Sequence, residues 1–132
     1  MTKAEFSLKA LKLALATLEE GLGAPPKNAL ERDGVIQRFE YTFELSWKMI
    51  RKGLLLLGKN QVSASPKLLI RDAFSESWIT SVEQWFEFLE ARNDSSHTYD
   101  QRRSDWVYSV AVRFPKEVHH LILELEKAVK SA

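Results

Sequence analysis

The sequence predicts an all-α protein in which four long helices pack as a bundle and one short extra helix connects two of them. Apolar residues recur at spacings of three and four along most of the chain, which is the periodicity of amphipathic helices. No segment alternates between apolar and polar residues for long enough to predict a strand. The length of 132 residues suits a single domain, residues 1–132, with one hydrophobic core.

The composition narrows the function classes. Lys and Arg exceed Asp and Glu by a net charge of +1, so no large field attracts nucleic acid or an anionic membrane non-specifically. The chain has no Cys, which excludes a disulfide framework and a thiolate metal site. Lys and Glu interrupt the apolar pattern of residues 1–20, unlike a signal peptide or a spanning helix. We therefore expect a cytoplasmic protein that does not bind a membrane.

Two amphipathic helices are predicted in the first half of the chain. The first carries leucines from Leu8 to Leu22 on one face and ends at glycines and Pro25. The second continues the same spacing from Ile36 to Leu57, and Gly58 and Asn60 are predicted to stop it. The length of this second pattern places its helix at the centre of the bundle.

Three further helical segments follow. Ser65 and Pro66 suit the N-cap and first position of a short helix over residues 65–74. The fourth helix is predicted from about Ser77 to Arg92, and the fifth segment from about Arg102 to Lys130. Pro115 lies within that last segment and predicts a break near Arg113 and Phe114, because proline lacks a backbone donor and crowds the preceding turn.

Arg92 falls on the apolar face of the predicted fourth helix, where an unpaired charge is costly. The residues that share this face are Trp78, Val82, Trp85, Phe86, Phe88 and Leu89. On the second helix Glu40 projects between Ile36 and Trp47 at the edge of the apolar stripe, and Glu44 lies just beyond it. An ion pair between Arg92 and Glu40 is therefore the structural interpretation. The apolar face is also wide enough to contact a second subunit.

Arg92 and His97 are the residue types of metal-free phosphodiester chemistry, since guanidinium clamps phosphate oxygens and imidazole transfers protons near neutral pH. Five residues apart, they would point about 140° from each other on an unbroken helix. Either the helix breaks or a second subunit contributes, and the sequence NDSS between them favours a break. A solvated turn without chemistry is the alternative. His119 and His120 are adjacent and lack the i, i+4 spacing of metal ligands, so no metal or cofactor is expected.

Three stretches together resemble a known family: DGVIQRFEYTFELSWK at residues 33–48, SPKLLIRDAF at 65–74 and RNDSSHTYD at 92–100. In order and spacing they are similar to the nucleotidyltransferase substrate-binding protein family, a branch of the HEPN superfamily. The resemblance covers nearly the whole chain. It implies a four-helix up-and-down antiparallel bundle that forms a homodimer and is encoded with a minimal nucleotidyltransferase as its partner.

The resemblance also implies roles for individual residues. Arg92, Asn93 and His97 match the catalytic motif of a metal-independent RNase, the toxin half of a HEPN/MNT toxin–antitoxin pair, and Tyr99 matches a tyrosine to which the partner adds AMP to silence the RNase. Glu40, Glu44 and Trp47 are expected to support the site or bind beside it.

The alternatives are a non-catalytic module that presents a nucleotide or substrate to the transferase, and a purely structural bundle. The sequence departs from the family pattern at Glu76, Ser77 and Trp78, where a glycine-containing turn is expected.

Overall fold

The computed structural model describes residues 1–59 and 61–132, and all regular structure within them is helical. This confirms the predicted all-α class. A short 3-10 turn covers Lys3–Glu5 and precedes the α-helices. The α-helices are α1 (Lys9–Gly21), α2 (Ala29–Leu56), α3 (Pro66–Ser75), α4 (Val82–Asp94), α5 (Gln101–Ala111) and α6 (Phe114–Ser131).

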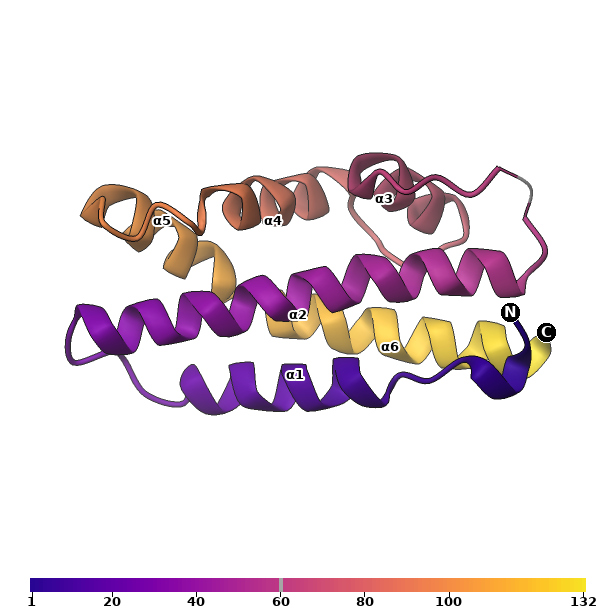
Figure 1. The fold of residues 1–132 in the computed structure, drawn as a ribbon, viewed down its shortest axis with the longest axis horizontal. Coiled ribbons are helices and arrows are strands. Elements are labelled where there is room, and N and C mark those ends of the chain that lie inside the picture. Colours follow the sequence, from indigo (N-terminus) through magenta and orange to yellow (C-terminus); the bar gives the residue numbers. More distant parts are fainter. Residues whose placement is uncertain (60) are drawn as a thin grey trace.

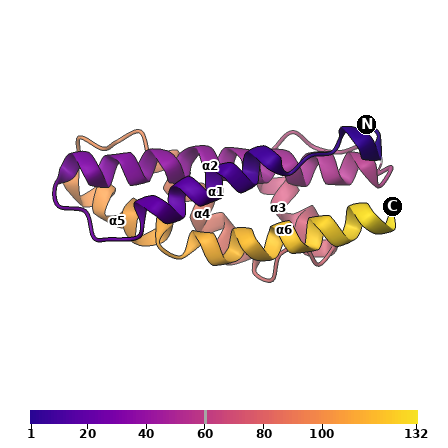
Figure 2. The same cartoon turned by 90° about the horizontal axis from the view of Figure 1, so that it is seen from below.

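α2 is the central helix, because it contacts each of the other α-helices. The chain direction alternates through α1, α2, α4 and α6, and α3, α4 and α5 follow one another along one side of α2 (Figure 1). Both termini lie at the same end of the bundle (Figures 1 and 2), where Lys3 Nζ donates to the carbonyl oxygen of Ala132 at 2.9 Å. The connection between α4 and α5 lies at the opposite end (Figure 1).

The two ends of α2 are fixed by local hydrogen bonds. Asn28 caps the N-terminus, since its side chain accepts from the backbone N–H of Glu31 at 2.9 Å. At the C-terminus Gly58 adopts φ +75°, and the next N–H, that of Lys59, donates to the carbonyl of Leu54 at 3.2 Å. This is a Schellman motif, which confirms the predicted stop at Gly58. Asn60, the other predicted stop, lies outside the described residues.

The predicted start of the fourth helix near Ser77 is wrong, because α4 begins at Val82. Ser77 adopts φ +63°, and Trp78 N–H donates to the carbonyl of Ala73 at 2.9 Å, so a second Schellman motif ends α3 there. Ser81 then caps α4 by accepting from the N–H of Gln84 at 3.1 Å. Trp78 is buried in the core, but from the connection between the helices and not from a face of α4.

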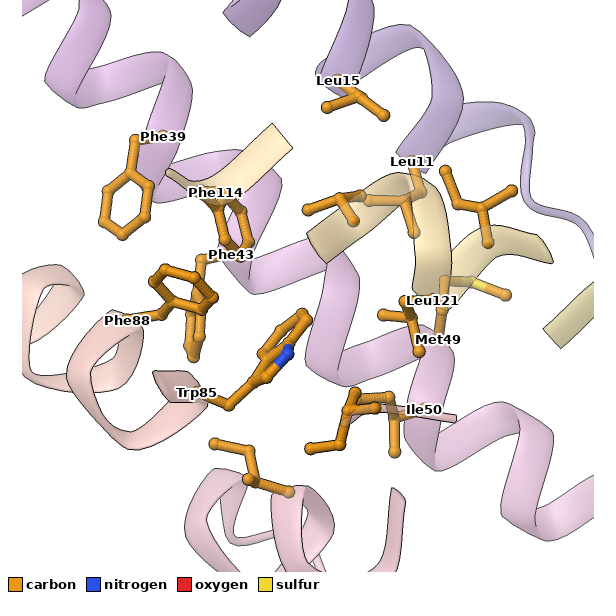
Figure 3. Close-up of a cluster of buried hydrophobic side chains, with 14 of the residues drawn as sticks. Leu11, Leu15, Phe39, Phe43, Met49, Ile50, Trp85, Phe88, Phe114 and Leu121 are labelled. Carbon is orange, nitrogen blue, oxygen red and sulfur yellow. The ribbon is translucent and has the colours of Figure 1, made fainter. Parts of the chain in front are cut away.

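The predicted break before Pro115 is confirmed, since α5 ends at Ala111 and α6 begins at Phe114. Phe114, the first residue after the break, lies in the core among the aromatic side chains of Phe39, Phe43, Trp85 and Phe88 (Figure 3). Its ring centroid lies 5.1 Å from that of Phe39, 5.5 Å from that of Trp85 and 4.8 Å from that of Phe88, all in edge-to-face contacts. Trp85 and Phe88 therefore serve the core of this chain, and only the rest of the apolar face of α4 is available to a second subunit.

None of the helices in the described ranges is both long enough and apolar enough to cross a membrane.

Candidate functional site

The segment from Arg92 to Tyr99 spans the break between α4 and α5. α4 continues to Asp94, two residues beyond the predicted end, and the chain then turns before α5 starts at Gln101. Within the turn the N–H of His97 donates to the carbonyl of Asp94, and the N–H of Asp100 donates to the carbonyl of His97, both at 3.0 Å. The predicted helix break between Arg92 and His97 is thus present, and it is an ordered turn.

Arg92 is held by Glu44 and not by Glu40, so the predicted Arg92–Glu40 pair is wrong. Its Nε donates to Glu44 Oε1, while Glu40 accepts from the hydroxyl of Ser95. The two contacts follow the antiparallel register of α4 on α2 (Figure 1), in which Arg92 lies beside Glu44 and the later residue Ser95 lies beside the earlier Glu40. Trp47 completes this contact, because its indole N–H donates to Glu44 Oε2 at 3.1 Å.

The guanidinium of Arg92 has a second fixed contact. Its Nη1 donates to the side-chain oxygen of Asn93 at 2.8 Å, and Asn93 is itself exposed. The Arg92 and Glu44 side chains each keep 28% of their surface exposed, so the guanidinium is oriented by its partners without being sealed from solvent. A planar donor group in this state is able to receive an anion.

His97 contacts Tyr99 on the other side of the break. Its Nδ1 lies 3.1 Å from the Tyr99 hydroxyl, and the two rings meet edge to face with centroids 5.8 Å apart. Within the described part of the chain, no hydrogen bond joins His97 to Arg92 or Asn93. One chain therefore presents an arginine–asparagine pair and a histidine–tyrosine pair on the same short segment.

Asp94 and Arg103 brace the turn across the break, and the sequence did not reveal this pair. Arg103 Nε donates to Asp94 Oδ1 at 2.9 Å, and Nη2 of the same guanidinium lies 2.6 Å from that oxygen. This hydrogen bond with Asp94 raises the pKa of Arg103 above its ordinary value. The sequence could not predict this pair, because helical periodicity does not relate two residues that lie on either side of a helix break.

Two polar side chains secure the start of α5. Asp100 caps the helix by accepting from the N–H of Arg103 at 3.3 Å, and the Ser104 hydroxyl donates to the carbonyl of Thr98 at 3.0 Å. Asp is a favoured N-cap residue. The capping role of Asp100 could therefore have been predicted from the sequence.

Tyr99 borders a hollow of about 580 Å³ between the turn and the start of α2. The side chain of Tyr99 is 82% exposed. Lys27 and Arg32 line the hollow together with Asp33 and Asp105, and Arg32 pairs with both carboxylates. The hollow is therefore polar, with its positive and negative charges balanced. No group of three potential metal ligands occurs among the residues that the structure describes.

The chain is thus an all-α protein of the antiparallel-bundle class (Figure 1), with Arg92 and His97 on either side of a helix break. Comparison with known families identifies the family to which it belongs. The chain belongs to the family described as "Nucleotidyltransferase substrate binding protein like", whose model matches residues 6–127. The family predicted from the three sequence stretches is thereby confirmed.

Relatives with known sequence or structure agree with this assignment. A Haemophilus influenzae protein named "Probable ribonuclease HepT" is 32% identical over 97 residues, which cover 71% of this chain and 66% of that protein. The chain thus spans about two thirds of that relative's length.

Two solved structures share the fold. A structure from Haemophilus influenzae, described as revealing the fold of a substrate binding domain of a nucleotidyltransferase, matches with a TM-score of 0.80 and 28% identity. The match covers 91% of this chain and 99% of the other. A crystal structure of a Thermus thermophilus protein matches with a TM-score of 0.74 and 29% identity, covering 89% and 98% of the two chains.

Proposed function

We propose that this protein is a metal-independent endoribonuclease and the toxin half of a HEPN/MNT pair, with Arg92, Asn93 and His97 as its catalytic residues. The observation that carries the proposal is the ordered turn after α4, which has an oriented guanidinium at one end and a half-buried imidazole at the other. The Haemophilus influenzae relative, whose name describes a ribonuclease, supports it.

Each residue has a separate task in this reaction. His97 removes the proton from a ribose 2′-hydroxyl or protonates the leaving oxygen, a contribution of about 10² to 10⁴ in rate. Arg92 stabilises the charge that builds on the phosphate oxygens, and Asn93 orients the guanidinium through its side-chain oxygen. Glu44, with Trp47 behind it, fixes Arg92 from the side of α2, and Glu40 fixes the turn through Ser95.

A homodimer would bring two such segments into one cleft. Phe86 and Leu89 on α4 and Trp47 on α2 remain half-buried in the single chain, which leaves apolar surface beside the segment. Aromatic residues and Arg are enriched in such interfaces. Light scattering is expected to give twice the 15.2 kDa of one chain, and a monomer at micromolar concentration would contradict the dimer.

The partner in this proposal is a minimal nucleotidyltransferase that silences the RNase by adding AMP to Tyr99. Tyr99 is largely exposed and lies next to His97, so a nucleotide attached there would cover the imidazole. The family to which the chain belongs supports a nucleotidyltransferase as the partner.

The decisive experiment compares RNA cleavage by the purified protein and by His97→Ala. We expect the wild type to cleave and the variant to lose at least about 10² in rate. His119→Ala is the matched control, since His119 lies on α6 and pairs with Glu19 on α1. Equal cleavage by wild type and His97→Ala, or none by either, would overturn the RNase assignment.

A second candidate function is a non-catalytic module that binds a nucleotide and presents it to the transferase. The description of the Haemophilus influenzae structure as a substrate binding domain of a nucleotidyltransferase favours it, and the partly exposed guanidinium of Arg92 is the group that would contact a nucleotide phosphate. Calorimetry with ATP is expected to detect binding that Arg92→Ala abolishes, and the absence of binding heat in the wild type would exclude this candidate.

A further inference from the structure

The side chains of His97 and Tyr99 meet at hydrogen-bond distance, with His97 Nδ1 3.1 Å from the Tyr99 hydroxyl. Both residues lie in a turn whose N–H groups are bound at His97 and Asp100, and whose carbonyl at Thr98 is bound by Ser104. The Asp94–Arg103 pair closes the turn from outside. These bonds fix the backbone from which both rings extend, and the imidazole and the phenol contact each other.

We propose that His97 accepts the proton of the Tyr99 hydroxyl when that oxygen attacks the α-phosphorus of a nucleoside triphosphate, so that His97 promotes the modification of its neighbour. This inference rests on the proposed nucleotide transfer to Tyr99. It assigns His97 a second reaction, in addition to RNA cleavage.

Tyr99 Oη forms a bond to the α-phosphorus of ATP, the bond from that phosphorus to the bridging oxygen breaks, and pyrophosphate leaves with the electron pair. The hydroxyl proton passes along the existing hydrogen bond to His97 Nδ1, which lies 3.1 Å from Oη. A neutral phenol is a weak nucleophile, and a base at hydrogen-bond distance is the usual means of activating one.

Tyr99 differs from the other two tyrosines of the chain in this respect. The Tyr41 hydroxyl is bound to the Thr17 hydroxyl, which is no base at neutral pH, and Tyr108 is half-buried against the core. Tyr99 alone combines a histidine at its oxygen with 82% exposure of its side chain, so an incoming phosphate has access to the activated atom.

The same hydrogen bond has a different direction in the two reactions. To accept the Tyr99 proton, Nδ1 must carry the lone pair and Nε2 the hydrogen. To act on a ribose hydroxyl through Nε2, the imidazole must adopt the opposite tautomer, in which Nδ1–H donates to Tyr99. The tautomer of His97 therefore determines which reaction it can assist: RNA cleavage or nucleotide transfer to Tyr99.

The first test needs no partner protein. N-acetylimidazole acetylates accessible tyrosine hydroxyls, and peptide mass spectrometry follows Tyr99 with Tyr41 and Tyr108 as internal references. If His97 activates Tyr99, His97→Ala slows acetylation of Tyr99 severalfold. If His97 merely covers Tyr99, the same substitution exposes the phenol further and speeds the reaction. An unchanged or faster rate in His97→Ala therefore overturns the inference.

The second test uses the cognate transferase, ATP labelled at the α-phosphate and three variants. His97→Ala and His97→Gln are expected to lower the rate of AMP transfer to Tyr99 by about 10²-fold, and free imidazole to restore part of it in His97→Ala. His119→Ala should transfer at the wild-type rate. His97→Gln keeps a polar group at the position but cannot take a proton, so a normal rate in that variant would overturn proton transfer.

The outcomes separate the inference from the proposal on which it rests. Transfer to wild-type Tyr99 that proceeds equally in His97→Ala overturns the inference and leaves the modification standing. A transferase that modifies other acceptors but not wild-type Tyr99 overturns the modification itself, and with it this role of His97.

Discussion

Arg92 of α4 and Glu44 of α2 form an ion pair that ties the end of one helix to the middle of another. The pair lies immediately before the turn that carries His97 and Tyr99. Because each side chain keeps 28% of its surface exposed, the pair contributes little to the free energy of unfolding, about 1 kcal/mol at most. Its larger effect is to give the guanidinium one orientation.

Removal of Glu44 is therefore expected to separate activity from stability. In Glu44→Ala, RNA cleavage should fall roughly tenfold, because Arg92 loses the partner that orients it. The free energy of unfolding in urea should change by no more than about 1 kcal/mol. Glu87→Ala removes a comparable surface pair, with Arg113, and should alter neither quantity appreciably. Wild-type cleavage by Glu44→Ala would show that the orientation of Arg92 does not depend on this carboxylate.

Two glycines of α2 are expected to respond to alanine with opposite signs. A Cβ at Gly34 meets no atom within 4 Å, so Gly34→Ala should stabilise the protein by about 0.5–1 kcal/mol through helix propensity. A Cβ at Gly53 would lie 3.0 Å from both Leu125 and the ring of Trp78. Overpacking there costs about 1–3 kcal/mol, so Gly53→Ala should destabilise. Urea denaturation of the two variants measures both signs, and stabilisation by Gly53→Ala would mean that Trp78 is free to move.

The two Schellman motifs give a matched pair of substitutions. Ser77 adopts φ +63°, which costs an ordinary residue about 1–2 kcal/mol, whereas Gly58 adopts φ +75° without that penalty. Ser77→Gly should therefore stabilise the protein by about 0.5–1 kcal/mol after the greater chain entropy of glycine is subtracted. Gly58→Ser should destabilise it by a similar amount. Thermal unfolding of both variants tests this, and a loss of stability in Ser77→Gly would show that the serine side chain compensates its backbone.

The brace between Asp94 and Arg103 predicts a local change in dynamics. In Asp94→Ala, amide hydrogen exchange at His97 and Asp100 should become roughly two- to fivefold faster, because their hydrogen bonds lie within the turn that Arg103 closes. Amides of α6 should exchange as before. Glu124→Gln, which removes a surface pair with Lys127, is the control. Unchanged exchange at His97 would show that the main-chain bonds of the turn suffice.

Most helices could be predicted from the sequence because each buries one face, and periodicity records that burial directly. The start of α4 could not, since Ser77 takes a backbone conformation that glycine usually marks. The partner of Arg92 depended on the antiparallel register of α4 against α2, which no spacing within one helix contains. The residue types at the site could be predicted, because Arg92 and His97 are recognisable from the sequence alone. The contacts of His97 with Tyr99 and of Asp94 with Arg103 could not, because they depend on the conformation of the turn between α4 and α5.

The nearness of the two chain ends has a practical consequence for experiments in cells. Reporter domains fused to either end would extend from the pole of the bundle remote from Arg92 and His97, so labelling should leave that segment accessible. The same proximity permits circular permutation: a brief linker could join Ala132 to Met1, with new ends opened in the exposed connection around Ala24 and Pro25. A permuted chain could then carry its fusion partner close to the segment, as a deliberate steric block.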